Sequence, residues 1–235
     1  MVTGVIEKFG GLDILVNCAG VIFEGDVETT FPQDFDYMMD LNLRLPFHLS
    51  NLFFPYLEKS SGCIVNVGCM MGHIPQQGMV SYCMTKAGLE MLTKNCALEY
   101  APFGIRVNCV APSHAETNMY RYTGLSEQEH RWLRQRASEN NPFGRLVLPE
   151  EVAKAVVFLT SDKAETITGH VLTVSGARHL TDAGYLKTWH GSERMDRRFE
   201  PTSSGMRSMW MNFKDKLFRR PPNAGEGSDA WVQWK

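Results

Sequence analysis

The chain has 235 residues, of which 43% are hydrophobic, so it is long enough to bury one sizeable core. Its net charge of -2 gives no electrostatic reason to expect nucleic acid as a partner. No apolar run approaches the roughly 20 residues that cross a bilayer, so we expect no membrane span.

The first residues and the cysteines indicate an intracellular protein. Residues 1–8 have the pattern of neither a signal peptide nor a transit sequence. The cysteines form no C-x-x-C pair, which argues against a zinc site. We therefore expect buried free thiols in a reducing compartment, either the cytoplasm or the mitochondrion. The cysteines stand at positions 18, 63, 69, 83, 96 and 109.

In chain order, four β-rich runs alternate with helical patterns. The runs are continuously apolar, as expected of parallel strands that are buried on both faces. The strands are predicted at 12–17, 63–67, 105–110 and 170–174, and the helices at 35–57, 80–100 and 150–160. Pro46 must cost the first helix a hydrogen bond or bend it, and Gly104 follows the second. This alternation predicts a doubly wound α/β sheet.

Residues 112–149 form a polar, irregular stretch with basic and aromatic side chains, among them Trp132 and Arg134. An excursion after the carboxyl end of a strand is where an open α/β sheet usually carries a substrate lid. A helical insert that only packs on the sheet is the alternative, and the sequence leaves both open.

From about residue 183 the composition changes, and we divide the chain into a domain at 1–182 and a tail at 183–235. The tail holds four of the five tryptophans, with 10 basic and 6 acidic residues. No periodicity in it suggests a second core. Scattered tryptophans with arginines are typical of a segment that docks on a partner. A disordered extension is the alternative.

Tyr82 and Lys86 are the most informative pair in the sequence. Their four-residue spacing places both side chains on one face of a helix. An ammonium beside a phenol favours the phenolate, which makes the tyrosine a usable proton donor or acceptor. A Tyr-x-x-x-Lys pair is weak evidence alone, because most such pairs are surface contacts.

Together with its neighbours, this pair resembles the short-chain dehydrogenase/reductase family, in its 3-oxoacyl-reductase-like branch. The resemblance covers about residues 5–181 and depends on several motifs in order. The matching segments are Leu15-Val16-Asn17-Cys18-Ala19-Gly20, Met39-Asp40-Leu41-Asn42, Ile64-Val65-Asn66-Val67-Gly68-Cys69, Tyr82 with Lys86, Pro112 followed by Thr117, and Ile167-Thr168-Gly169 through Gly176.

The resemblance implies a Rossmann-like fold and hydride transfer between NAD or NADP and a carbonyl or alcohol. It implies that Tyr82 moves the proton of the substrate oxygen, with Lys86 lowering the pKa of that tyrosine and binding the nicotinamide ribose. Asn42 matches the asparagine of the family's proton relay, and Cys69 stands where the catalytic serine is expected. The cofactor-binding positions implied are Asn17, Ala19, Gly20, Tyr82, Lys86, Pro112 and Thr117. No metal is implied.

The first departure from the family concerns the cofactor's phosphates. No G-x-G-x-x-G or G-x-x-x-G-x-G run occurs in the sequence, although a Rossmann site needs this turn to meet the pyrophosphate. The first strands of the usual sheet are also missing, so strand 12–17 is expected at an edge, with an apolar face that lacks its helix. We expect either a truncated gene product or another chain that covers this edge.

The second departure lies among the site residues. Cys69 replaces the serine, and a thiol is a larger and weaker hydrogen-bond donor than a hydroxyl. Cys18, Ser113 and Ser175 replace an asparagine, a glycine and an aspartate of the family motifs. A reactive Cys69 thiolate beside Lys86 is an alternative, and an inert thiol is favoured.

Two functions follow from these observations. The first is an NAD(P)-dependent oxidoreductase that acts on a small carbonyl or alcohol. The second is a catalytically inactive scaffold or complex subunit that docks through residues 183–235. Family members are commonly dimers or tetramers through helices 35–57 and 80–100, so a homo-oligomer or a larger protein assembly is expected by resemblance.

Overall fold

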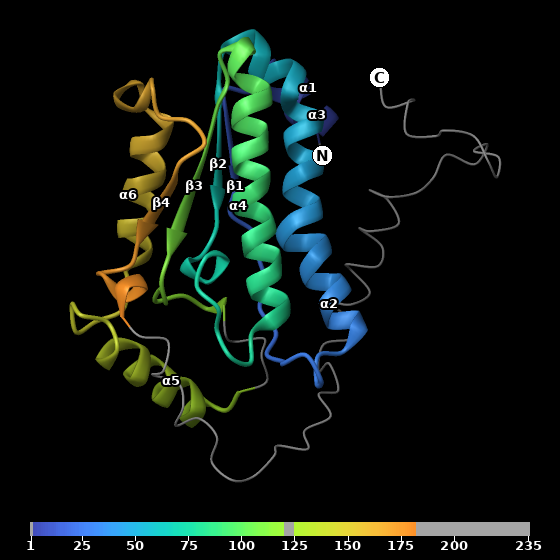
Figure 1. Cartoon of the computed structure of the whole chain (residues 1–235). Coiled ribbons are helices and arrows are strands. Elements are labelled where there is room, and N and C mark those ends of the chain that lie inside the picture. Colours follow the sequence, from blue (N-terminus) through green and yellow to red (C-terminus); the bar gives the residue numbers. More distant parts are fainter. Residues whose placement is uncertain (1, 120–124, 182–235) are drawn as a thin grey trace, which may run out of the picture. The chain divides into compact units, whose positions relative to one another are not determined.

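The computed structural model describes residues 2–119 and 125–181. In these ranges a parallel sheet of order β1-β2-β3-β4 carries helices on both faces (Figure 1). Its strands are β1 (Ile14–Asn17), β2 (Cys63–Val67), β3 (Arg106–Pro112) and β4 (Val171–Val174). The predicted α/β class and doubly wound parallel sheet are confirmed, and all four strands lie within two residues of their expected bounds.

Alternate residues of each strand contact different helices, because successive side chains of a strand point to opposite faces. On one face, Ile64 and Val107 pack against two helices. These are α3 (Leu45–Ser60), through the fully buried Leu57, and α4 (Val80–Tyr100), through Cys96 and Ala97. On the other face, Val65 and Val110 pack against Leu159 of α6 (Pro149–Thr160). The two helix layers are visible on either side of the sheet in Figure 1.

Strand β1 lies at the edge of the described sheet, where it pairs with β2 alone. Leu15 and Asn17 are buried, whereas Ile14 and Val16 are 44% and 41% exposed. Burial on both faces is therefore confirmed for β2 and β3, only partial for β4, and wrong for β1. The reason is that α6 contacts β2, β3 and β4 and leaves that face of β1 open, as the edge position predicted.

The single helix predicted at 35–57 is confirmed, and it extends a few residues further at each end, but it contains a π turn that the sequence did not predict. The structure has α2 (Pro32–Met39), a π-helical turn at Asp40–Arg44, and then α3. Pro46, which has no N–H to donate, closely follows this turn, at the second residue of α3. The π turn carries Asn42, and such turns often occur at functional sites.

One helix near residue 1 was not predicted from the sequence, and a second lies in residues 112–149, where a helical insert was one of two open alternatives. Helix α1 (Val2–Phe9) precedes the sheet. Its Val2, Val5 and Ile6 pack against the core cluster that contains Leu57, Ile64 and Val107. Helix α5 (Glu127–Glu139) lies in the polar stretch after β3, and Ser126 and Glu129 form a capping box at its start.

The predicted tail at 183–235 lies outside the described residues. Within the described ranges, no helix is both long and apolar enough to cross a membrane.

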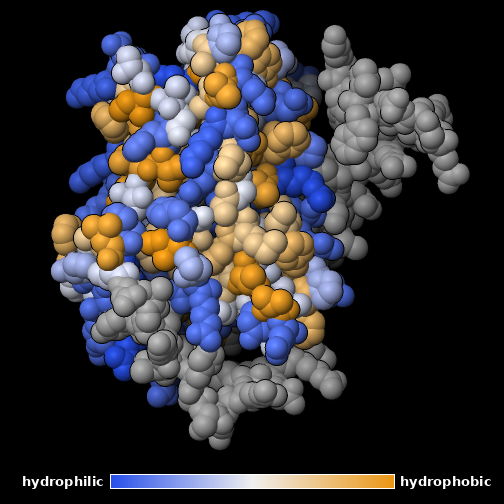
Figure 2. Space-filling view, in the orientation of Figure 1, coloured by the Kyte–Doolittle hydropathy of each residue, from blue (hydrophilic) through white to orange (hydrophobic). Residues whose placement is uncertain are grey.

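The outer face of α4 carries an apolar stripe. Met84, Met91 and Leu98 recur every seven residues and are 50%, 56% and 78% exposed. Phe47 of α3 is also exposed, and it borders a hollow of about 230 Å³ that Leu43 and Leu92 help to line. Figure 2 shows hydrophobic surface over this part of the molecule.

Candidate active site

Tyr82 and Lys86 lie side by side on the buried face of α4, as their spacing predicts. Tyr82 is 4% exposed and Lys86 is 3% exposed. The Lys86 Nζ lies 5.6 Å from the centroid of the tyrosine ring and donates a hydrogen bond of 3.0 Å to the Val67 carbonyl oxygen at the end of β2. Burial lowers the pKa of Lys86 because it disfavours the charged form.

Cys69 follows β2, and its thiol lies in the same buried cluster as the Tyr82 side chain. The side chain is 8% exposed and belongs to one core cluster with Tyr82. Burial raises the pKa of the Cys69 thiol, against smaller opposing effects of the Met71 N–H, the Lys86 ammonium and a hydrogen bond with Tyr82. The thiol therefore keeps its proton near neutral pH, which favours a weak hydrogen-bond donor over a reactive thiolate.

Asn42 and Thr85 connect the π turn to α4. The Asn42 side chain accepts a hydrogen bond of 2.9 Å from the Val21 N–H and donates one of 2.8 Å to the Val21 carbonyl oxygen. It also donates to Thr85 Oγ1 at 3.2 Å, and that hydroxyl donates to the Tyr82 carbonyl oxygen at 2.8 Å. The two residues thus hold the segment after β1 and the turn of α4 that carries Tyr82 in a fixed relation.

Gly20 packs closely against this group. A Cβ atom at this position would lie 3.3 Å from Asn42 Oδ1, 3.6 Å from Lys86 Nζ and 3.9 Å from Met119 Cε. The Met119 sulfur also accepts a long contact of 3.9 Å from the Tyr82 hydroxyl. A side chain at Gly20 would therefore crowd the asparagine and come into contact with the lysine.

Asn17 takes part in a different, buried network. Its Nδ2 donates to Asn66 Oδ1 at 2.8 Å, and Asn66 donates to Thr93 Oγ1 of α4 at 2.9 Å. This chain of bonds ties β1 to β2 and α4 beneath the site. The Asn17 Oδ1 atom is buried and has no hydrogen-bond partner among the described residues, at the carboxyl end of β1.

The remaining predicted cofactor positions lie after β3. Pro112 ends β3 and pairs with Val174 of β4. Thr117 is exposed and accepts a hydrogen bond of 3.4 Å from the Met119 N–H. Ser113 and Ser175, which replace a glycine and an aspartate, are buried together, and the Ser113 hydroxyl donates to the Ser175 carbonyl oxygen at 3.4 Å.

The six cysteines are all free, as expected, but they are not all buried. Cys63, Cys69, Cys96 and Cys109 are buried, Cys83 is partly buried, and Cys18 is exposed. The exposure of Cys18 corrects the sequence-based expectation, and it follows from its place just beyond the edge strand β1. No group of three or more metal-ligating side chains could hold a metal ion within the described residues.

Three features of the site were not found from the sequence. Met119 touches Tyr82 from a polar loop whose pattern gives no signal for such a contact. Thr85 lies inside the Tyr82–Lys86 interval, where its pairing with Asn42 is a tertiary contact. Glu90, one turn beyond Lys86, is buried, and its Oε1 lies 2.9 Å from His73 Nδ1. The helical spacing of Lys86 and Glu90 was the only available signal for it.

Comparisons with known proteins give a consistent family. A family model described as Enoyl-(Acyl carrier protein) reductase matches residues 1–179. A 3-oxoacyl-[acyl-carrier-protein] reductase of Thermotoga maritima is 36% identical over 177 residues, which cover 75% of this chain and 70% of the relative.

Two solved structures have the same fold. One is a gluconate 5-dehydrogenase from Burkholderia cenocepacia in complex with NADP and tartrate, with a TM-score of 0.70 and 25% identity over 77% of this chain and 70% of that one. The other is a 3-ketoacyl-(acyl-carrier-protein) reductase from Brucella melitensis complexed with NADH, with a TM-score of 0.67 and 30% identity over 76% of this chain and 72% of that one.

Proposed function

Because the chain belongs to the short-chain dehydrogenase/reductase family, we propose that it transfers hydride between NAD or NADP and the carbonyl or alcohol carbon of a small molecule. The observation that carries this proposal is the buried cluster of Tyr82, Lys86 and Cys69. It combines a phenol, an ammonium and a second donor in one place shielded from water, where their electrostatic effects are strongest.

In the reducing direction, the Tyr82 hydroxyl gives its proton to the substrate oxygen as the carbonyl carbon receives hydride. The Lys86 ammonium, 5.6 Å from the tyrosine ring centroid, stabilises the phenolate that remains. The Cys69 thiol donates a hydrogen bond that orients the substrate oxygen, more weakly than a hydroxyl does. In the oxidising direction the proton and the hydride both move the other way.

The residues present fit the nicotinamide end of the cofactor. Lys86 Nζ donates a single hydrogen bond, to Val67, and its other N–H groups are buried without a protein acceptor in the described chain. The backbone at Gly20 passes close to that ammonium, where a Cβ atom would lie 3.6 Å from Nζ. When bound, the nicotinamide supplies or accepts the hydride. Lys86 is the residue that would hold its ribose, with Asn17, Ala19, Gly20, Tyr82, Pro112 and Thr117 around it, while Asn42 keeps the relay position.

A titration with reduced cofactor tests this proposal. We expect NADH or NADPH fluorescence to change saturably on addition of the 235-residue chain. Lys86→Met removes a charged donor worth about 1.5–3 kcal/mol, so affinity should fall at least about tenfold. Lys94→Met is the matched control, because Lys94 is an exposed lysine of the same helix, and it should bind like the wild type. A wild-type chain that shows no saturable change would contradict the proposal.

The second candidate function is an inactive scaffold or complex subunit that docks through residues 183–235. It is favoured by the thiol at Cys69, which stands where the resemblance places a serine. Under this function the titration shows no binding, and the chain co-purifies with a fixed partner that is lost when 183–235 are deleted. Saturable micromolar binding of the cofactor would exclude it.

We also propose that a second copy of the chain covers the stripe of Met84, Met91 and Leu98. The stripe lies on one of the two helices through which the resemblance implied association. Phe47 and the hollow beside Leu43 extend the apolar surface onto α3 and the π turn. Burial of side chains that are half or more exposed supplies the driving force for such a contact.

A further inference from the structure

Glu90 is a buried acid on the inner face of α4 that the proton transfer proposed for Tyr82 does not use. It lies one helical turn beyond Lys86, and its side chain is 9% exposed. Burial of a carboxylate is costly unless the group is paired. The partner is His73, which follows the short helical turn Met70–Gly72, and its Nδ1 lies 2.9 Å from Glu90 Oε1. A carboxylate only accepts hydrogen bonds, so the imidazole donates through its Nδ1–H.

The turn that precedes His73 also carries Cys69. The Gly72 N–H donates a hydrogen bond of 2.8 Å to the Cys69 carbonyl oxygen. The N–H groups of His73 and Ile74 both donate to the Met70 carbonyl oxygen, at 3.2 and 3.0 Å. Because these bonds join residues 69–74 into one compact unit, a displacement of His73 is passed on to Cys69.

Gly72 lets this turn lie directly on the backbone of α4. A Cβ atom at this position would lie 2.5 Å from Glu90 Oε1 and 3.0 Å from the carbonyl carbon of Lys86, which is too close for a side chain. At the other end of the segment, a Cβ atom at Gly68 would lie 2.6 Å from the Cys109 sulfur of β3. The segment between the two glycines therefore fits closely against α4 at one end and against β3 at the other.

Apolar packing and the hydrogen bond to Glu90 constrain the turn in different ways. Met70 and Met71 are buried in the core cluster that contains Cys69 and Tyr82. Hydrophobic contacts are not directional, and methionine side chains are flexible, so this packing fixes the depth of the turn more than its orientation. A hydrogen bond is directional, so the bond to Glu90 adds the missing constraint.

We propose that Glu90 and His73 are positioning residues of the proposed oxidoreductase. Their hydrogen bond holds the turn on α4 and thereby aims the Cys69 thiol at the substrate oxygen beside Tyr82. A thiol is a weak donor, so its contribution depends strongly on alignment. This inference rests on the proposed function and adds to it two residues that act only through Cys69.

Hydrogen exchange of the 235-residue chain, followed by NMR, tests the contact without an assay of activity. Glu90→Met removes the acceptor and keeps an unbranched side chain that favours a helix. The amides of Gly72, His73 and Ile74 should exchange about tenfold faster in this variant, because a hydrogen bond to a charged group is lost. The amides of β3 should keep their rates. Unchanged exchange at 72–74, or equal acceleration in β3, would overturn the inference.

Two further variants control this measurement. Glu90→Gln keeps an oxygen that accepts from the His73 Nδ1–H, so its exchange should match the wild type. Glu99→Met makes the same change at an exposed glutamate of the same helix, and it should leave the amides at 72–74 unaffected. If Glu99→Met accelerates exchange as much as Glu90→Met does, the effect does not come from the contact with His73 and the inference fails.

Steady-state reduction of para-nitrobenzaldehyde by NADPH tests the link to catalysis. Glu90→Met should lower kcat by about tenfold, less than the loss of a strong oxyanion donor. The KM for NADPH should stay within about twofold, because the bond from Lys86 to Val67 does not involve the turn. Glu90→Gln should restore kcat.

A Cys69→Ala background shows whether the pair acts through the thiol. In that background Glu90→Met should lower kcat no further, because the group that the turn aims is already gone. An additional tenfold loss there, or a Glu90→Gln variant as impaired as Glu90→Met, would overturn the inference.

The failures of the two proposals are distinguishable. If the wild-type chain is active and Glu90→Met keeps its kcat, the positioning inference fails and the oxidoreductase proposal stands. If the wild-type chain transfers no hydride from NADPH to any carbonyl compound, the oxidoreductase proposal fails and the positioning role falls with it, whatever the exchange rates at 72–74.

Discussion

Tyr82→Phe should lower kcat/KM for carbonyl reduction by about 10²–10⁴-fold, the usual contribution of one positioned proton donor. The variant removes a single oxygen atom from a side chain that is 4% exposed, so the ring keeps its contacts within the core cluster. The Met119 contact of the hydroxyl is long, at 3.9 Å, so its loss should affect stability little. The assay is the oxidation of NADPH followed by absorbance.

The control for this variant is Tyr56→Phe. Tyr56 is a partly buried tyrosine of α3. It packs against the core cluster of Leu57, Ile64 and Val107, whereas Tyr82 belongs to a different cluster. Its substitution removes the same atom and should leave kcat/KM unchanged. If both variants lose activity equally, or if Tyr82→Phe keeps full activity with an unchanged thermal midpoint, Tyr82 is not the proton donor.

Cys69→Ser should raise kcat/KM by about tenfold, because a hydroxyl donates a stronger hydrogen bond to a developing oxyanion than a thiol does. The thiol is buried and keeps its proton, since burial raises its pKa. The smaller hydroxyl fits the same space next to Tyr82 and Lys86. The measurement is steady-state reduction of one carbonyl substrate by both forms at equal enzyme concentration.

Cys83→Ser is the matched control for the thiol. Cys83 packs against the same core cluster as Cys69 but lies next to Tyr82 on α4, with its thiol partly buried. Its replacement should leave kcat/KM within about twofold of the wild type, because surface-proximal substitutions of this kind are usually small in effect. A Cys69→Ser variant that is less active than the wild type would show that the thiol has a role a hydroxyl cannot fill.

The strands and α4 could be predicted because their side-chain patterns are dictated by burial. The runs around Ile64 and Val107 are apolar because helices cover both faces of the central strands. Helix α4 combines helical spacing with Gly104 just past its end, and its predicted bounds agree with the structure. Patterns of this kind are local, so they are readable in one sequence.

The π turn at Asp40–Arg44 could not be predicted, because one extra residue in a helix leaves no composition signal. What the turn does is tertiary: Asn42 bonds to Val21 and Thr85, residues that lie 21 and 43 positions away. The same reason hides Met119, which reaches Tyr82 from a loop. It also hides the edge exposure of Cys18, which depends on which strands and helices surround β1.

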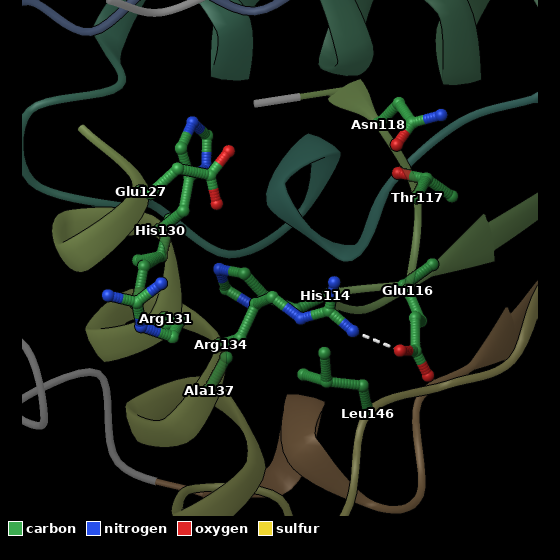
Figure 3. A pocket seen from close by; sticks show the side chains of 12 residues that line it. His114, Glu116, Thr117, Asn118, Glu127, His130, Arg131, Arg134, Ala137 and Leu146 are labelled. Carbon is green, nitrogen blue, oxygen red and sulfur yellow. Dashed lines mark hydrogen bonds and ion pairs between the residues drawn. The ribbon is translucent and has the colours of Figure 1, made fainter. Parts of the chain in front are cut away.

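Of the candidate site, the helical spacing of Tyr82 and Lys86 was readable, and the structure places them together with Cys69, Asn42 and Gly20. A cavity of about 200 Å³ was not readable. Its lining combines α5 with residues 114–118, and only the fold shows that His114 and His130 face the same space (Figure 3). The sequence identifies residues 112–149 as a polar, irregular stretch. A substrate lid and a packing insert differ only in where the stretch lies in the fold, which the sequence does not show.

The most direct test of the account is deuterium transfer from NADPH labelled at the nicotinamide C4 position. The 235-residue chain is incubated with the labelled cofactor and a set of simple aldehydes, ketones and aldoses, and the products are analysed by mass spectrometry and ²H NMR. If the chain transfers hydride with Tyr82 as proton donor, we expect deuterium on the carbinol carbon of at least one product with the wild-type chain, and none above background with Tyr82→Phe. A wild-type chain that binds the cofactor saturably yet transfers no deuterium to any carbonyl compound would contradict the account.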